Sequence, residues 1–285
     1  MRIGIQLPSF SYGGQAADIG PTFGRLVREA DQAGLDSLWV MDHFFQIRTV
    51  GSAEEPMLEG WSALAFAAAH TQRITLGTMV TGVHYRHPGV LVKTATTLDV
   101  LSGGRAWLGI GAGWNEQESR GLGIPFPSTT ERFERLEETL QIALQMWAGD
   151  ESPYAGRHFQ LDRPLNSPSA VRRPHPPVLI GGGGEKKTLR LVAKYADACN
   201  LFDSPELPHK LEVLRDHCER EGRDQAEIEK TALHALTADA TVDQAVDAVG
   251  RLAEEGVEHV IFSLKAAHQP GAVTMLADVL AQVAH

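Results

Sequence analysis

The sequence predicts an α/β protein built as a single (β/α)8 barrel. Short apolar runs alternate with amphipathic stretches of helical period, eight such units can be counted, and the chain has 285 residues. Strands that alternate with helices imply parallel strands joined by right-handed crossovers. Eight units at this length favour a closed barrel. The alternative is a doubly wound sheet, which needs two polar edge strands, and only residues 231–235 have that character.

The eight predicted strands are apolar runs bounded by turn residues, which is typical of buried strands. They cover residues 2–6, 37–41, 74–80, 105–110, 177–180, 198–202, 231–235 and 257–263.

The eight predicted helices show apolar residues at spacings of three and four, and most end before a glycine. Ser128 with Glu131, and Thr241 with Gln244, have the spacing of a capping box. The helices are predicted at 23–30 before Gly34, at 61–70, from Pro88 to near Gly103, from Ser128 to Trp147, at 185–196, at 207–218 before Gly222, from Thr241 to Gly256, and at 273–283.

Residues 148–176 interrupt this alternation, because the helical period vanishes and five prolines break up the segment. We expect an insertion after the fourth βα unit, near the mouth of the barrel, with a short hairpin around residues 154–161. No repeat, low-complexity tract or linker indicates a second domain. Residues 1–285 are therefore predicted to form one domain.

The net charge, the apolar runs and the cysteines limit which partners and locations we expect for the protein. The formal net charge is −10 and no basic run offsets it, which argues against nucleic-acid binding. The longest apolar stretch, residues 63–69, is too short to span a membrane, and the N-terminus resembles a strand more than a signal peptide. Cys199 and Cys218 have no spacing typical of a disulfide framework or a metal site. A cytoplasmic location is expected.

Functional residues of such barrels gather where the strands run into the following loops. The second predicted strand ends in Asp42 and His43, and an imidazole at the rim can contact a cofactor or transfer a proton. The alternative is an Asp that caps the next turn beside a partly buried His. His84 and His87 follow the third strand, but no third ligand lies at a suitable spacing. We therefore expect no metal.

Two glycine-rich turns follow the fourth and fifth strands. Gly109, Gly111 and Gly113 would let the backbone approach a ligand closely, although small residues that pack in the barrel top explain them as well. Their spacing does not fit the dinucleotide fingerprint. Four consecutive glycines, residues 181–184, precede a helix. This arrangement is typical of backbone amides that bind a phosphate at a helix N-terminus.

Taken together, these segments resemble the bacterial-luciferase-like superfamily and, within it, the F420-dependent oxidoreductases. The likeness covers essentially the whole chain, with GIQLP at the start, AGLDSLWVMDHF at the second strand, LGIGAGWNEQE at the fourth and PPVLIGGGGEKK at the fifth. The resemblance implies a luciferase-like TIM barrel. It also implies a hydride transfer between C5 of the deazaflavin F420 and an organic substrate.

The resemblance also assigns the site. Asp42 and His43 match residues at the reactive ring of the cofactor, where His43 is the predicted catalytic residue. Met79 and Val80 match a bulge that commonly contains a non-prolyl cis peptide and presses against the ring. The predicted cofactor-binding residues are Asp42, His43, Met79, Val80, Thr81, Ala112, Gly113 and Asn115 around the ring and its polyol chain, and Gly182, Gly183, Gly184 and Glu185 at the phosphate. Lys186, Lys187 or Arg190 could assist the anionic tail.

Two positions depart from the family pattern. In F420-dependent sugar-phosphate dehydrogenases a Trp after the Asp-His pair and a Glu after the fourth-strand glycines take part in catalysis. Ile47 and Trp114 stand there in this chain, which argues against the oxidation of a sugar phosphate by that mechanism.

Two alternatives stay open beside the F420 enzyme. One is an FMN-dependent monooxygenase that receives reduced flavin from a partner reductase, and the other is a non-catalytic barrel that binds such a ligand. The expected substrate is a small organic molecule recognised by residues 10–14, 43–58, 84–87 and the insertion. A homodimer through the Ala-rich helix at residues 64–69 is also predicted.

Overall fold

The computed structural model describes residues 1–283 and confirms a closed parallel barrel. The eight barrel strands are β1 (Arg2–Leu7), β2 (Ser37–Val40), β3 (Thr75–Thr78), β5 (Ala106–Gly111), β8 (Val178–Gly181), β9 (Ala198–Phe202), β10 (Glu229–Leu236) and β11 (His259–Leu264). They follow one another in chain order around the barrel, and the β1–β11 pairing closes it. The short β4 (Thr81–Gly82) continues the third strand and pairs with β5.

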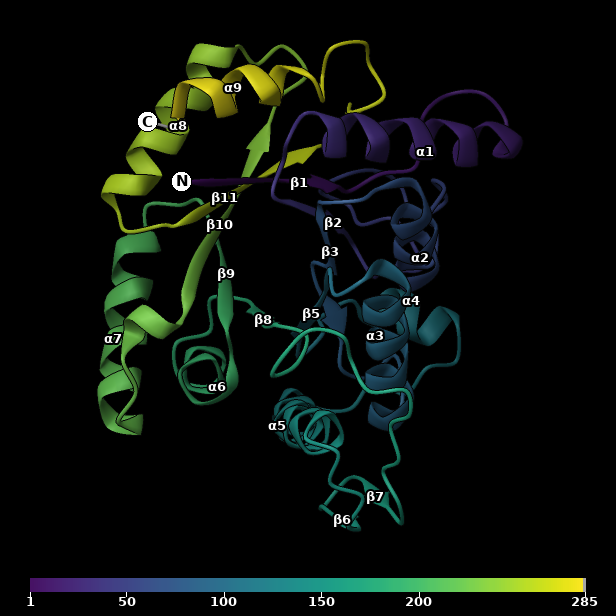
Figure 1. The fold of residues 1–285 in the computed structure, drawn as a ribbon, viewed down its shortest axis with the longest axis vertical. Helices are drawn as coiled ribbons and strands as arrows, with labels where there is room; N and C mark the ends of the chain where they lie inside the picture. Colours follow the sequence, from purple (N-terminus) through teal and green to yellow (C-terminus); the bar gives the residue numbers. More distant parts are fainter. Residues whose placement is uncertain (284–285) are drawn as a thin grey trace.

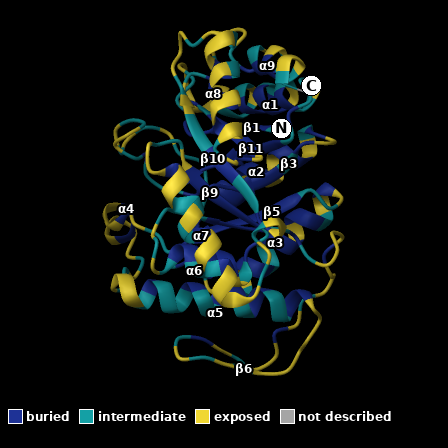
Figure 2. Ribbon diagram, turned by 90° about the vertical axis from the view of Figure 1, so that its left-hand side faces the viewer, coloured by how far each residue is buried: buried dark blue, intermediate teal, exposed yellow. Residues whose placement is uncertain are grey.

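The helices surround the strands (Figure 1) and turn their exposed residues outward (Figure 2). They are α1 (Ala16–Gln32), α2 (Gly60–His70), α3 (Pro88–Ser102), α4 (Glu116–Gly121), α5 (Thr129–Trp147), α6 (Thr188–Tyr195), α7 (Leu207–Glu221), α8 (Val242–Glu254) and α9 (Met275–Val283). Ser128 and Thr241 cap α5 and α8 as predicted. The helix predicted from residue 185 begins at Thr188, and α4 was not predicted.

The barrel interior is filled by large apolar side chains below the mouth. Trp39 and Trp107 meet edge to face, with ring centroids 5.8 Å apart. Leu179, Ile261 and Met79 complete this buried cluster. Because the interior is packed, any open space must lie above these residues, at the C-terminal ends of the strands.

The third strand is interrupted between β3 and β4, where the Met79–Val80 peptide is cis. The break brings the carbonyl oxygen of Thr78 against Gly109, and a Cβ at Gly109 would lie 1.7 Å from that oxygen. The Val80 side chain occupies space left by two more glycines. A Cβ at Gly111 or Gly181 would lie 3.0 or 2.8 Å from it. These three glycines therefore make room for the interrupted strand.

The predicted position of the insertion at the barrel mouth was wrong. Residues 148–176 connect the end of α5 to the start of β8, so both of their ends lie opposite the mouth. Between these ends the segment runs over the outside of the barrel, and its hairpin of β6 (Tyr154–Ala155) and β7 (Gln160–Leu161) lies beyond α5 (Figure 1).

Two carboxylates on the outer helices hold this segment, which we call the outer strap. Glu138 of α5 accepts hydrogen bonds from the backbone amides of residues 157–159. Asp99 of α3 accepts them from the amides of Val171 and Arg172, at 2.7 and 3.0 Å. The polar groups of the strap are thus satisfied by helix surfaces and not by the site.

The structure also describes the two cysteines and the exposed face of α2. Both cysteines are buried and free. No helix within residues 1–283 is long and apolar enough to cross a membrane. On α2, Phe66 is 41% exposed. The homodimer through this helix stays a prediction.

The packing at Gly109 yields a stability test. Gly109→Ala would force a methyl group into the Thr78 carbonyl, and we expect the free energy of unfolding to fall by about 3 kcal/mol, as in overpacked cores. Gly250→Ala is the matched control, because Gly250 lies in α8 with no atom near its Cβ position. That change should raise the free energy of unfolding by about 0.5–1 kcal/mol. Urea unfolding followed by circular dichroism measures both, and equal effects would contradict the packing argument.

Candidate functional site

A large cavity opens at the C-terminal ends of the strands, with a volume of about 1150 Å³. Such a volume exceeds the roughly 300–1,000 Å³ of an ordinary small-molecule pocket. Met79, Val80 and Leu233 line it directly above the packed interior. The space therefore suits a large cofactor together with a substrate.

His43 lies in the wall of this cavity and is held by a buried carboxylate. Its Nδ1 is 2.6 Å from Oε1 of Glu118, a residue of α4 whose side chain is 0% exposed. The hydroxyl of Tyr85 donates to the same oxygen. The ring of His43 also meets Trp114 edge to face at 5.3 Å. His43 is thus oriented by contacts on one side and open to the cavity on the other.

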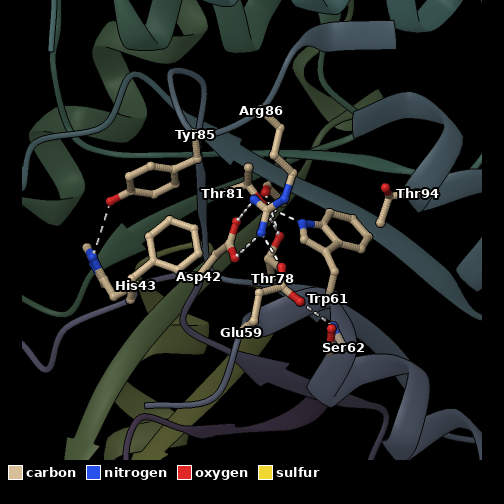
Figure 3. A network of polar contacts seen from close by, with 12 residues as sticks. Asp42, His43, Glu59, Trp61, Ser62, Thr78, Thr81, Tyr85, Arg86 and Thr94 are labelled. Carbon is tan, nitrogen blue, oxygen red and sulfur yellow. Dashed lines mark hydrogen bonds and ion pairs between the residues drawn. The ribbon is translucent and has the colours of Figure 1, made fainter. Parts of the chain in front are cut away.

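Asp42 points away from the cavity into a buried ion pair (Figure 3). Its two carboxylate oxygens accept hydrogen bonds from Arg86 at 2.5 and 2.9 Å, and Arg86 also pairs with Glu59. Burial raises the pKa of the Asp42 carboxyl, and the hydrogen bonds and charge of Arg86 oppose that rise. Asp42 therefore fixes the loop beneath His43, as a charge that is paired and hydrogen-bonded in the interior.

The hydroxyl groups of Thr78 and Thr81 lie on either side of the break in the third strand. Thr81 accepts a hydrogen bond from Nε1 of Trp61 at 3.1 Å and donates one to Thr78 at 3.0 Å. Thr78 in turn donates to the carbonyl of Gly109 at 2.8 Å. This relay holds Met79 and Val80 at the bottom of the cavity, while Thr81 itself stays buried outside the lining.

Another part of the cavity wall is built from the glycine turn and the start of α5. Gly181, Gly182 and Thr188 line it together with Thr129 and Arg132. Gly182 has a φ of +117°, a conformation that requires glycine. Thr188 begins α6, so the positive end of that helix dipole lies beside this part of the wall.

Arg132 supplies a positive charge in the part of the cavity wall formed by the glycine turn and α5. It is 8% exposed, and its guanidinium lies over the ring of Phe126 at 4.1 Å. Nη1 donates to the carbonyl of Pro127 at 2.5 Å and Nη2 to Thr129 at 3.3 Å, whereas its buried Nε has no partner among residues 1–283. Arg132, the helix dipole and the glycine turn together suit a bound anion, such as a phosphate.

The structure brings about half of the predicted site residues into the cavity wall. These are His43, Met79, Val80, Ala112, Gly113 and Gly182. The other six, namely Asp42, Thr81, Asn115, Gly183, Gly184 and Glu185, do not line the cavity. Asn115 begins α4, and Glu185 pairs with Lys210 of α7 at 2.5 Å.

The basic residues after the glycine turn have other partners. Lys187 donates to Thr130 at 3.3 Å, and Arg190 pairs with Glu137 at 2.7 Å. Neither lines the cavity, and Lys186 does not line it either. Arg132 takes the position that these residues were expected to fill.

Several walls come from loops at the mouth. As predicted, residues 10–14, 43–58 and 84–87 contribute Ser11, Ile47, Glu55 and Tyr85 among others, whereas the outer strap contributes nothing. The loops after β10 and β11 were not predicted and add residues 237–238 and Lys265.

His84 is half-buried next to the site and belongs to no recognisable set of metal ligands among residues 1–283. Its Nε2 lies 2.9 Å from the hydroxyl of Ser119. Burial, and next the charge of Arg132, lower the pKa of His84 to about 4, so the imidazole is neutral near pH 7. Within residues 1–283 no group of three metal-ligating side chains is found.

Comparisons with known proteins identify the family. A family model described as luciferase-like monooxygenase matches residues 1–279. An F420-dependent glucose-6-phosphate dehydrogenase of Kineococcus radiotolerans is 32% identical over 77% of the chain. The match spans 64% of that relative, so the chain covers less than two thirds of its length.

Solved structures share the fold at low sequence identity. An F420-dependent secondary alcohol dehydrogenase in complex with an F420-acetone adduct has a TM-score of 0.84 at 17% identity, with 99% of this chain and 98% of that chain covered. The oxygenating constituent of 3,6-diketocamphane monooxygenase of Pseudomonas putida, in complex with FMN, has a TM-score of 0.79 at 17% identity and the same coverage. The family model, which matches nearly the whole chain, and the barrel architecture lead to one conclusion: this protein belongs to the luciferase-like family.

Proposed function

We propose that the protein is an F420-dependent oxidoreductase that transfers a hydride between C5 of the deazaflavin and an organic substrate. The observation that carries this proposal is that one cavity is lined both by anion-binding groups and by a held imidazole. A glycine turn, a helix N-terminus and Arg132 form one part of its wall, and His43, held by the Glu118 carboxylate, forms another part. The F420-dependent dehydrogenase of Kineococcus radiotolerans, 32% identical, supports the choice of cofactor.

The residues present fit such a cofactor. Gly182, Thr188 and Arg132 would hold its phosphate, and Met79 and Val80 would support one face of its ring. When bound, F420 supplies a carbon that accepts or gives a hydride. The protein fixes the ring face, excludes water through its apolar walls, and places the His43 imidazole where a substrate proton can be taken or returned.

An FMN-dependent monooxygenase is the competing function. The FMN-bound monooxygenase with the same fold favours it, and an anion clamp does not distinguish F420 from FMN, since both present a phosphate. The reduced deazaflavin reacts poorly with oxygen because carbon replaces N5, so the two functions differ in chemistry. Fluorescence titration of the apo-protein with each cofactor separates them, and FMN binding at micromolar concentration without F420 binding would contradict our proposal.

The anion clamp can be tested by one pair of variants. Arg132→Gln removes the guanidinium beside the cavity, and we expect the Kd for F420 to rise at least about tenfold, because a charge-assisted hydrogen bond is lost. Arg190→Gln is the control, since Arg190 pairs with Glu137 outside the cavity. The control should change the Kd less than about twofold. Equal Kd values for the two variants would remove Arg132 from the clamp.

A variant of His43 tests whether this residue acts in catalysis or in cofactor binding. His43→Ala should lower kcat for hydride transfer by about 10²-fold or more, the usual contribution of a general acid or base. The Kd for F420 should stay within about threefold, because the phosphate end is untouched. Stopped-flow absorbance of F420 measures the rate, and fluorescence titration measures the Kd. Unchanged turnover would exclude His43 from the mechanism, whereas lack of turnover in the wild type would support the non-catalytic alternative.

A further inference from the structure

The two ring nitrogens of His43 have different surroundings. Nδ1 lies 2.6 Å from Oε1 of Glu118 and 3.5 Å from the hydroxyl oxygen of Tyr85. For Nε2, no hydrogen bond is found within residues 1–283, and the His43 side chain lines the cavity at 11% exposure. Nε2 is therefore the nitrogen that a bound molecule can reach.

Glu118 accepts hydrogen bonds on both of its oxygens. The backbone amides of Phe44 and Phe45 donate to Oε2 at 2.7 and 3.1 Å, and the Tyr85 hydroxyl donates to Oε1. Burial raises the pKa of the Glu118 carboxyl, but its hydrogen bonds and the charge of His43 lower the pKa more, so the net value lies below the usual one. An ionised carboxylate only accepts hydrogen bonds. The proton in the 2.6 Å contact must then reside on Nδ1 of His43.

We propose that Glu118 fixes the tautomer of His43. It keeps a proton on Nδ1 and thereby makes Nε2 the proton acceptor that faces the cavity. In neutral imidazole one nitrogen donates and the other accepts, so holding one proton in place decides the role of the other nitrogen. Glu118 does not line the cavity and is a positioning residue. The Tyr85 hydroxyl completes the hydrogen bonds of its Oε1.

The chemical step, which rests on the proposed function, balances with this tautomer. When a carbon that bears a hydroxyl group is oxidised, a bound F420 would supply the acceptor for its hydrogen and the bonding electron pair. The hydroxyl proton passes to Nε2, and a carbonyl group forms. The imidazolium that results is stabilised by the Glu118 carboxylate. In the reverse direction Nε2 returns the proton to the carbonyl oxygen, so the same pair serves oxidation and reduction.

Glu118 reaches His43 from α4, four residues after Trp114, and contacts the ring nitrogen that faces away from the cavity. Glu118 thus acts through His43 and not on a bound molecule.

The tautomer can be measured without cofactor. Two-bond ¹H–¹⁵N spectra of the apo-protein near pH 7.5 show which nitrogen of neutral His43 carries the proton, with the signals assigned by their loss in His43→Ala. We expect Nδ1–H in the wild type and loss of this preference in Glu118→Gln. In the holoenzyme, Glu118→Gln should lower kcat by about 10²-fold while the Kd for F420 stays within about threefold.

Glu116→Gln is the matched control on the same helix, because Glu116 is half-exposed and pairs with Arg120 at 2.7 Å. It should leave the tautomer and kcat unchanged. A wild-type spectrum with the proton on Nε2 would overturn the proposal even if Glu118→Gln failed to fold. So would a folded Glu118→Gln variant with wild-type kcat. Lack of F420 turnover in the wild type would instead contradict the proposed function, and the spectrum would still decide the tautomer.

Discussion

The close approach of the Thr78 carbonyl to Gly109 is the contact on which the cavity depends. It allows the third strand to break before β4 and turns Val80 toward two further bare positions, Gly111 and Gly181. The bottom of the cavity is therefore shaped by three strands at once. A side chain on any of these glycines would displace Val80 or the Thr78 carbonyl and so change the floor of the cavity, which Gly111 and Gly181 also line.

Two networks of charged side chains hold the residues around this surface. The Asp42–Arg86–Glu59 network, in which Asp42 is buried, fixes the loop after β2, and Glu118 orients the neighbouring His43. Adjacent residues of one dipeptide thus have different roles, one in holding the backbone and one in facing the cavity. Arg132 contributes a charge without an ion pair of its own among the described residues. The site combines the imidazole of His43 with a fixed cation in the wall of one cavity.

Much of this could be predicted from the sequence, and the errors have physical causes. The eight strands follow from apolar runs, and the glycine turn and the Asp42–His43 pair follow from their positions at strand ends. The insertion was misplaced because its prolines indicate irregular structure but not which end of the barrel it joins. Glu118 could not be distinguished from Glu116, since α4 is too short to show a helical period. Arg132, in contrast, lies four residues before the buried Leu136, and a charged residue at that spacing was a signal of burial.

The outer strap affects how the barrel can unfold locally. Its amides donate hydrogen bonds to carboxylates on α3 and α5, and its end leads directly into β8. The strap thus links three elements that are separate in the chain. Arg132 and the glycine turn both sit in this quadrant, on α5 and just after β8. Local unfolding of α3, α5 or the segment before β8 would therefore break contacts to the other two. The cavity wall at Arg132 and Gly182 is carried by two elements of this coupled set.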